Sequence, residues 1–75
     1  MAHERIVWDA KIMSGKPVIR GTRIPVETIL RWLGKGTSIA ELLDAYPTLT
    51  REDVYAAQTF AADLLANERL VTAAE

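Results

Sequence analysis

The sequence predicts a small α+β domain, mostly α, in which short N-terminal β-strands precede three helices in a helix-turn-helix-like, winged-helix-like arrangement. Two observations predict this fold. After residue 25, apolar side chains recur at the helical spacing i, i+3, i+4 and i+7 in successive stretches. Before it, they form short β-branched runs interrupted by Gly and Pro, as in strands joined by turns. We assign residues 1–75 to one domain, with a β-hairpin region at 1–24, three helices at 25–67 and a tail at 68–75.

The strands are predicted around the stretch 15–26, which reads GKPVIRGTRIPV. A first strand is expected at Arg5–Trp8, which is β-branched and aromatic. Within the stretch, residues 17–19 predict a second strand, and Gly21 supplies a residue that tolerates positive φ at a hairpin tip. Residues 22–24 would form the return strand, so the pattern predicts a hairpin contained within 15–26.

This turn is also the candidate binding site. Arg20 and Arg23 would flank the tip, and exposed guanidinium groups suit phosphate oxygens or a partner's carboxylates. The alternative is that both arginines are simply solvated at a turn. The predicted nucleic-acid or partner-binding residues are Lys16, Arg20, Gly21, Thr22, Arg23 and, in the tail, Arg69.

Local signals delimit the first two helices. The first is expected to start after Pro25, whose fixed φ suits a helix start, and to end at Gly34 and Gly36. Ser38 and Glu41 have the spacing of a capping box, which predicts the start of the second helix. That helix should stop before Pro47, because the residue preceding a proline is disfavoured in the helical region.

The third helix is predicted to begin after Thr50, capped with Asp53, and to end near Asn67. Leu49 and Val54 have the spacing of a hydrophobic staple. The buried side is expected to consist of Val54, Ala57, Phe60, Ala61, Leu64 and Leu65. Leu70-Val71 is a candidate for a further pairing segment.

The short connection between the second and third helices matches a helix-turn-helix outline. The first turn of the third helix nevertheless carries Arg51 together with Glu52 and Asp53, and phosphates repel carboxylates. Capping and favourable interaction with the helix dipole account better for the two acids. If DNA is bound, the basic hairpin is therefore the expected contact.

Large aromatic side chains point to self-association. Trp8 is interpreted as either a core anchor or a dimer anchor, and Trp32 lies off the main apolar stripe of its helix. With Tyr55, these residues are the predicted oligomer interface. A small domain also gains stability by associating, so we predict a homodimer.

Composition excludes several classes of site. The 75 residues contain no cysteine, so no disulfide or thiolate metal site can form. His3 is the only histidine and has no evident partner in the sequence. No Ser-His-Asp set, paired catalytic carboxylates or metal-ligand cluster can be assembled, so we expect no catalysis, metal or cofactor. Without an apolar run of membrane-spanning length or a signal-peptide core, a cytoplasmic protein is expected.

Charge is divided unevenly along the chain. Residues 1–37 carry seven basic and three acidic side chains, a net charge of +4, whereas residues 38–75 carry two basic and seven acidic ones, a net charge of −5. Such asymmetry indicates two surfaces with different partners, or contact between copies.

The stretch GKPVIRGTRIPV, with Gly36, Ser38, Tyr46-Pro47 and Leu49-Thr50, resembles a small prokaryotic family, domain of unknown function family 433. The resemblance runs from about residue 6 to residue 65. One departure is Asp9-Ala10, where relatives often have Asp-Pro, and this change is expected to loosen the loop without changing the fold.

Family members are described as helix-turn-helix-like domains, often encoded beside a PIN-like ribonuclease as the antitoxin of a type II toxin–antitoxin pair. The resemblance therefore implies that this chain binds and neutralises a PIN-like toxin, with repression of the shared operon as a second implied role. A stand-alone DNA-binding regulator and a structural dimerisation module are the alternatives. The family has no established catalytic residues to transfer to this chain.

Overall fold

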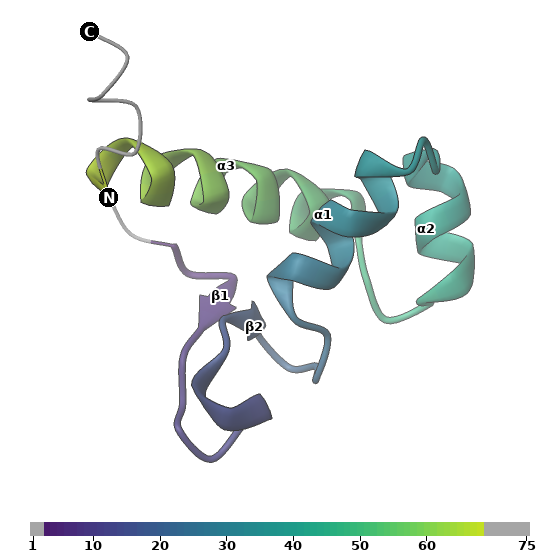
Figure 1. Ribbon diagram of the computed structural model, residues 1–75. Helices are drawn as coiled ribbons and strands as arrows, with labels where there is room; N and C mark the ends of the chain where they lie inside the picture. Colours follow the sequence, from purple (N-terminus) through teal and green to yellow (C-terminus); the bar gives the residue numbers. More distant parts are fainter. Residues whose placement is uncertain (1–2, 69–75) are drawn as a thin grey trace, which may run out of the picture.

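The computed structural model describes residues 3–68 and consists of two short strands followed by three helices (Figure 1). The strands are β1, Ile6–Val7, and β2, Val18–Ile19. The helices are α1, Val26–Gly34, α2, Ile39–Ala45, and α3, Arg51–Glu68. The prediction of an α+β domain, mostly α, is confirmed.

The strand pairing differs from the predicted hairpin. β2 pairs antiparallel with β1, with Ile6 opposite Ile19 and Val7 opposite Val18. The expected return strand at 22–24 is reduced to an isolated bridge between Val18 and Pro25. Because α1 begins directly after Pro25, and proline has no N–H to donate, too few residues remain for a second ladder. The predicted hairpin within 15–26 is therefore present only in part, as this bridge and two backbone hydrogen bonds, Ile19 N–H to the Ile24 carbonyl oxygen at 3.0 Å and Val26 N–H to the Pro17 carbonyl oxygen at 2.9 Å. The strand ladder forms with β1 instead.

The connection between β1 and β2 forms a long loop, drawn at the bottom of Figure 1. It includes a short 3₁₀ turn, Met13–Gly15, in which Ser14 has φ 58° and ψ 32°. Asp9 begins the loop by accepting a hydrogen bond from the Lys11 backbone N–H at 2.9 Å.

The helix boundaries follow the predicted caps. Ser38 Oγ accepts from the Glu41 N–H at 3.1 Å, while the Glu41 carboxylate accepts from the Ser38 N–H at 2.9 Å. Thr50 and Asp53 make the same reciprocal pair, at 3.1 and 3.0 Å. Both capping boxes predicted from sequence spacing are confirmed, because each depends only on residues three positions apart.

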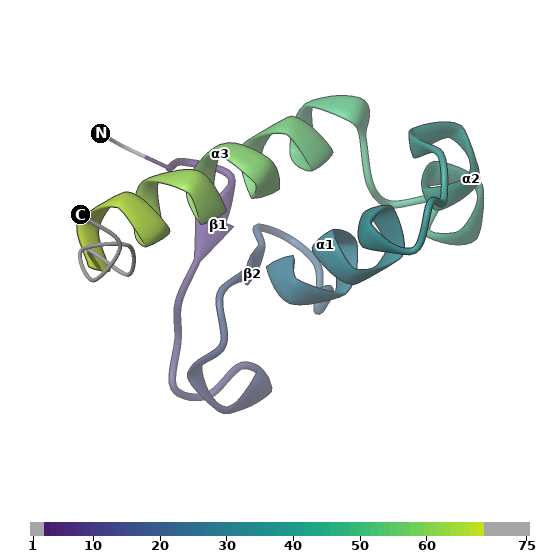
Figure 2. The same cartoon turned by 45° about the horizontal axis from the view of Figure 1, so that its top comes forward.

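The core lies between the three helices and the strand pair. In Figures 1 and 2, α3 runs along one side of the molecule, with α1 and the strands against it and α2 at one end. Every helix and strand contributes to the buried cluster, which comprises Ile6, Ile19, Val26, Ile29, Leu42, Leu49, Val54, Ala57 and Phe60.

The C-terminal part of α3 departs from the prediction. Leu64 and Leu65 were expected to be buried, but they are 40% and 53% exposed. The helix α3 is 18 residues long, which is longer than the core that it covers. Its apolar stripe therefore continues beyond the last position that the rest of the described chain buries.

Candidate partner-binding surface

The turn after β2 is held by a threonine and a glycine. Thr22 donates to the Ile19 carbonyl oxygen with both its backbone N–H, at 3.0 Å, and its hydroxyl, at 2.8 Å. The same hydroxyl oxygen accepts from the Ile24 N–H at 3.0 Å. Gly21 takes φ +81°, a region that favours glycine. We call residues 19–23 the arginine turn.

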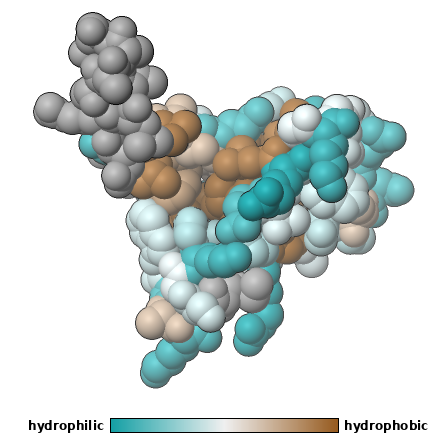
Figure 3. All heavy atoms as spheres, viewed as in Figure 1, coloured by the Kyte–Doolittle hydropathy of each residue, from teal (hydrophilic) through white to brown (hydrophobic). Residues whose placement is uncertain are grey.

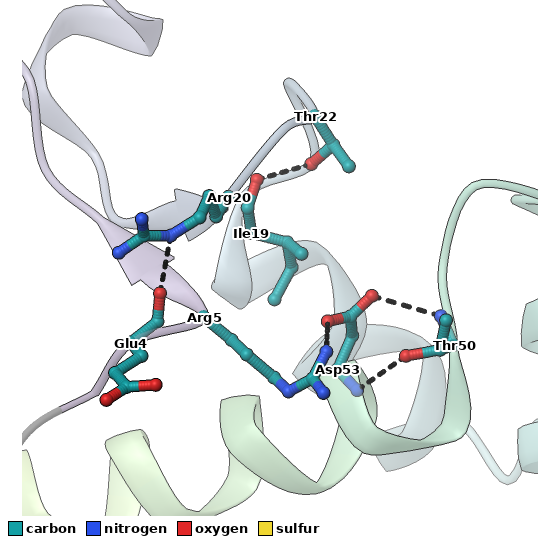
Figure 4. Close-up of polar contacts among 7 residues, drawn as sticks. All are labelled: Glu4, Arg5, Ile19, Arg20, Thr22, Thr50 and Asp53. Atoms are coloured by element: carbon teal, nitrogen blue, oxygen red, sulfur yellow. Dashed lines mark hydrogen bonds and ion pairs between the residues drawn. The ribbon is translucent and has the colours of Figure 1, made fainter.

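Arg20 is fixed at this turn by contacts with the residues that precede β1. Its Nε donates to the Glu4 carbonyl oxygen at 2.6 Å (Figure 4). Its backbone N–H donates to the Arg5 carbonyl oxygen at 2.7 Å. The bond to Glu4 uses only the Nε atom of the guanidinium group. The side chain is exposed, so its terminal nitrogens can bond to a partner.

The structure brings Arg20 next to Arg5, a juxtaposition not predicted from the sequence. The β1–β2 register places Arg5 opposite Arg20, and like charges directly opposite are unfavourable. The two guanidinium groups point apart: Arg20 reaches Glu4, whereas Arg5 reaches Asp53 at the start of α3 (Figure 4). A shallow hollow lined by Glu4, Arg5 and Arg20 lies between them.

Asp53 connects the start of α3 to Arg5, the residue directly before β1. Its side chain is buried, and it accepts from Arg5 Nη1 at 3.0 Å through Oδ1 and from the Thr50 N–H through Oδ2. The predicted capping role is therefore confirmed, with an added ion pair across 48 positions of sequence. Glu52, by contrast, is exposed in the first turn of α3.

The other basic residues predicted to bind a partner are Lys16, Arg23 and Arg69, and their surroundings differ. Arg23 is exposed and lines a separate hollow with Val7 and Ile12; within residues 3–68 it makes no ion pair or side-chain hydrogen bond. Lys16 is paired with Glu27, Nζ to Oε1 at 3.2 Å, and Glu27 also approaches Arg31 at 3.6 Å. Arg69 lies outside the described residues, as does the Leu70-Val71 segment. Arg20 and Arg23 are thus the exposed cations of the arginine turn.

The ion pair of Lys16 has a measurable consequence for Glu27. The hydrogen bond and charge of Lys16, with a smaller effect of Arg31, hold the pKa of Glu27 below its ordinary value. A lowered pKa in the folded state contributes stability above the ordinary glutamate pKa, and this contribution is lost as the pH falls through the lowered value. We expect Lys16→Met to return the pKa of Glu27 toward its ordinary value in an NMR carboxyl titration. Lys11→Met, which removes an equal charge from the β1–β2 loop, should leave the titration of Glu27 unchanged; equal shifts in both variants would contradict the specific pair.

The predicted interface residues separate into two groups. Trp8 and Tyr55 are 59% and 49% exposed, so Trp8 is not a core anchor. Trp32 is half-buried and packs on the core, with its ring 5.5 Å from that of Tyr46. The second packing surface predicted for Trp32 is thus met within the chain. The homodimer stays a prediction, with Trp8 and Tyr55 as its exposed aromatic candidates.

Residues 3–68 offer neither a metal site nor a membrane span. No cluster of three or more metal-ligating side chains occurs among these residues. None of the helices in this part of the chain is both long and apolar enough to cross a membrane.

Two uncharacterized proteins have sequences similar to that of this chain. The chain is 35% identical over 60 residues to the uncharacterized protein y4eO of Sinorhizobium fredii, covering 80% of this chain and 27% of the relative. It is 64% identical over 28 residues to an uncharacterized protein of Archaeoglobus fulgidus, covering 37% of this chain and 78% of that protein. The chain therefore spans only about a quarter of the length of the first relative.

A crystal structure of a DUF433 member protein from Anabaena variabilis has the same fold. The TM-score is 0.75 at 37% sequence identity, and the alignment covers 79% of this chain and 58% of that one. The family model described as protein of unknown function (DUF433) matches residues 6–61, from β1 into α3. The chain belongs to the DUF433 family.

Proposed function

We propose that this chain is the antitoxin-like component of a type II toxin–antitoxin pair, and that it neutralises a PIN-like ribonuclease by direct binding. The observation that carries the proposal is the arginine turn, where Arg20 is exposed yet anchored to Glu4. PIN-type nucleases hold their metal with carboxylates, and a guanidinium group forms strong charge-assisted hydrogen bonds with carboxylates.

The rigidity of the turn supports this role. Thr22 and Gly21 fix the backbone, and the hydrogen bond from Arg20 to Glu4 restricts the side chain before a partner arrives. Less conformational entropy is therefore lost on binding than for a free arginine on a loop. Occupation of the acidic metal site by such a group would also exclude the RNA substrate.

Growth rescue tests the proposal. The PIN-like protein encoded beside this chain is expressed alone and together with the chain. We expect the wild type to restore growth, Arg20→Ala/Arg23→Ala to fail, and a variant truncated after Asn67 to succeed. Rescue lost only on truncation would move the contact to the tail that contains Arg69. Absence of both rescue and a copurified complex with the wild type would contradict the antitoxin function.

DNA binding is the second candidate, favoured by the short connection between α2 and α3 at residues 46–50. Asp53 is committed to the cap and Glu52 is exposed, so the start of α3 is poorly suited to phosphates. If DNA binds through the arginine turn, Arg20→Ala/Arg23→Ala should weaken binding. It should also reduce the slope of log affinity against log salt concentration by about two units. Binding abolished instead by Arg51→Ala/Glu52→Ala, two exposed positions that leave the Asp53 cap intact, would place the contact on α3.

The predicted homodimer would serve either function, because it would present two arginine turns to a partner. Light scattering at micromolar concentration is expected to give twice the monomer mass. A monomer mass under these conditions would contradict the dimer.

A further inference from the structure

A hollow of about 430 Å³ lies beside the C-terminal half of α3, on the side of the N-terminal segment. In Figure 3, apolar atoms gather at the upper left, where this part of α3 lies. The hollow differs from the arginine turn in its chemistry, because its side chains combine aromatic rings with one carboxylate. The residues that carry the inference are His3, Trp8, Phe60, Asp63 and Leu64.

The carboxylate of Asp63 is partly open to the hollow. Its side chain is 40% exposed, although its Oδ2 atom is covered and lies 3.0 Å from His3 Nε2, close enough for an ion pair when the imidazole is protonated. A ligand that supplies an N–H can therefore bind the carboxylate through its exposed part.

Aromatic rings form the wall beside this carboxylate. Phe60 is contacted edge-on by His3, with ring centroids 5.2 Å apart, and by Trp8 at 5.0 Å. Trp8 is also 59% exposed. The faces of aromatic rings attract cations, and tryptophan does so most strongly. An anion would be repelled by Asp63, and a neutral apolar group would cover the exposed part of its carboxylate without supplying a donor.

We propose that this hollow binds an arginine side chain of a partner protein. The planar guanidinium group can donate to a carboxylate and stack on an aromatic ring at the same time, which an ammonium group does less well. The inference does not depend on the antitoxin function, because it rests on Asp63, Phe60 and Trp8 and not on the arginine turn.

The test is an NMR titration of the full chain with N-acetyl-arginine amide, following the two tryptophan indole N–H signals. We expect a saturable shift of the Trp8 signal with millimolar affinity, while the Trp32 signal serves as an internal control and stays in place. Asp63→Asn should weaken binding at least tenfold, with an unchanged Trp32 signal showing that the fold is intact. N-acetyl-norleucine amide, which has an aliphatic stem without the charge, should not bind.

Three results would overturn the proposal. Equal binding of the norleucine compound would identify a merely apolar hollow, and no saturable Trp8 shift would exclude an arginine site. The third concerns the source of the arginine, since Arg69 belongs to the same chain. Arg69→Ala is expected to bind the probe as the wild type does; binding seen only in Arg69→Ala would assign the site to the chain's own arginine.

Discussion

Replacement of Asp53 by alanine is expected to lower the free energy of unfolding by about 2–3 kcal/mol. The change removes the acceptor of the α3 capping box and leaves Arg5 without its partner. A cap contributes about 1 kcal/mol. The hydrogen bond to a charged group adds about 1.5 kcal/mol, near the low end of its range, because Arg5 is half exposed and solvent screens the pair.

Such a loss is large for a domain of this size, whose total stability is expected to be about 4–11 kcal/mol. Urea denaturation followed by far-UV circular dichroism measures it directly. Glu52→Ala is the matched control, since it removes an exposed carboxylate one residue away, and it should change stability by less than about 0.5 kcal/mol. Equal effects of the two substitutions would show that the buried contacts of Asp53 are not responsible.

Replacement of both Arg20 and Arg23 by alanine is expected to weaken the complex with the PIN-like partner about a hundredfold or more. Each charge-assisted hydrogen bond contributes about 1.5–3 kcal/mol, and every 1.4 kcal/mol corresponds to a factor of ten in affinity. Isothermal titration calorimetry with a catalytically inactive partner measures the change.

The control for this pair must remove the same charge elsewhere. Lys11→Ala/Lys35→Ala does so at two exposed positions outside the arginine turn. It is expected to change the affinity by less than about fivefold, mainly through the association rate. If both double variants weaken binding equally, general charge attraction and not the arginine turn is the cause.

Local features of this fold were predictable from the sequence. The start of α1 after Pro25 and the capping boxes of α2 and α3 depend on residues within one helical turn of one another. Such interactions leave their signal in residue spacing, which is why these helix boundaries agree with the structure.

Non-local features were not predictable in the same way. The choice of β1 and not residues 22–24 as the partner of β2 depends on where the chain returns in space. The Arg5–Asp53 pair joins residues 48 positions apart, and the pairing of His3 with Asp63 likewise has no signal in spacing. Burial of Leu64 and Leu65 was predicted from periodicity alone, which identifies the apolar side of a helix but not how far a neighbour covers it.

The candidate site was predicted only in part. Exposure of Arg20 and Arg23 at a turn follows from the glycine between strand-like runs, and the structure agrees. The anchoring of Arg20 on Glu4 depends on the β1–β2 register, and the commitment of Lys16 to Glu27 depends on how the loop packs beside α1. Neither contact could be predicted from residue spacing, because each joins segments that only the folded chain brings together.

The most direct test of the central claim is RNA cleavage by the purified PIN-like protein in the presence of this chain. The account predicts that the wild type abolishes cleavage at a one-to-one ratio, and that Arg20→Ala/Arg23→Ala leaves most of the cleavage activity intact at the same ratio. Full cleavage in the presence of a tenfold excess of folded wild-type chain would contradict it.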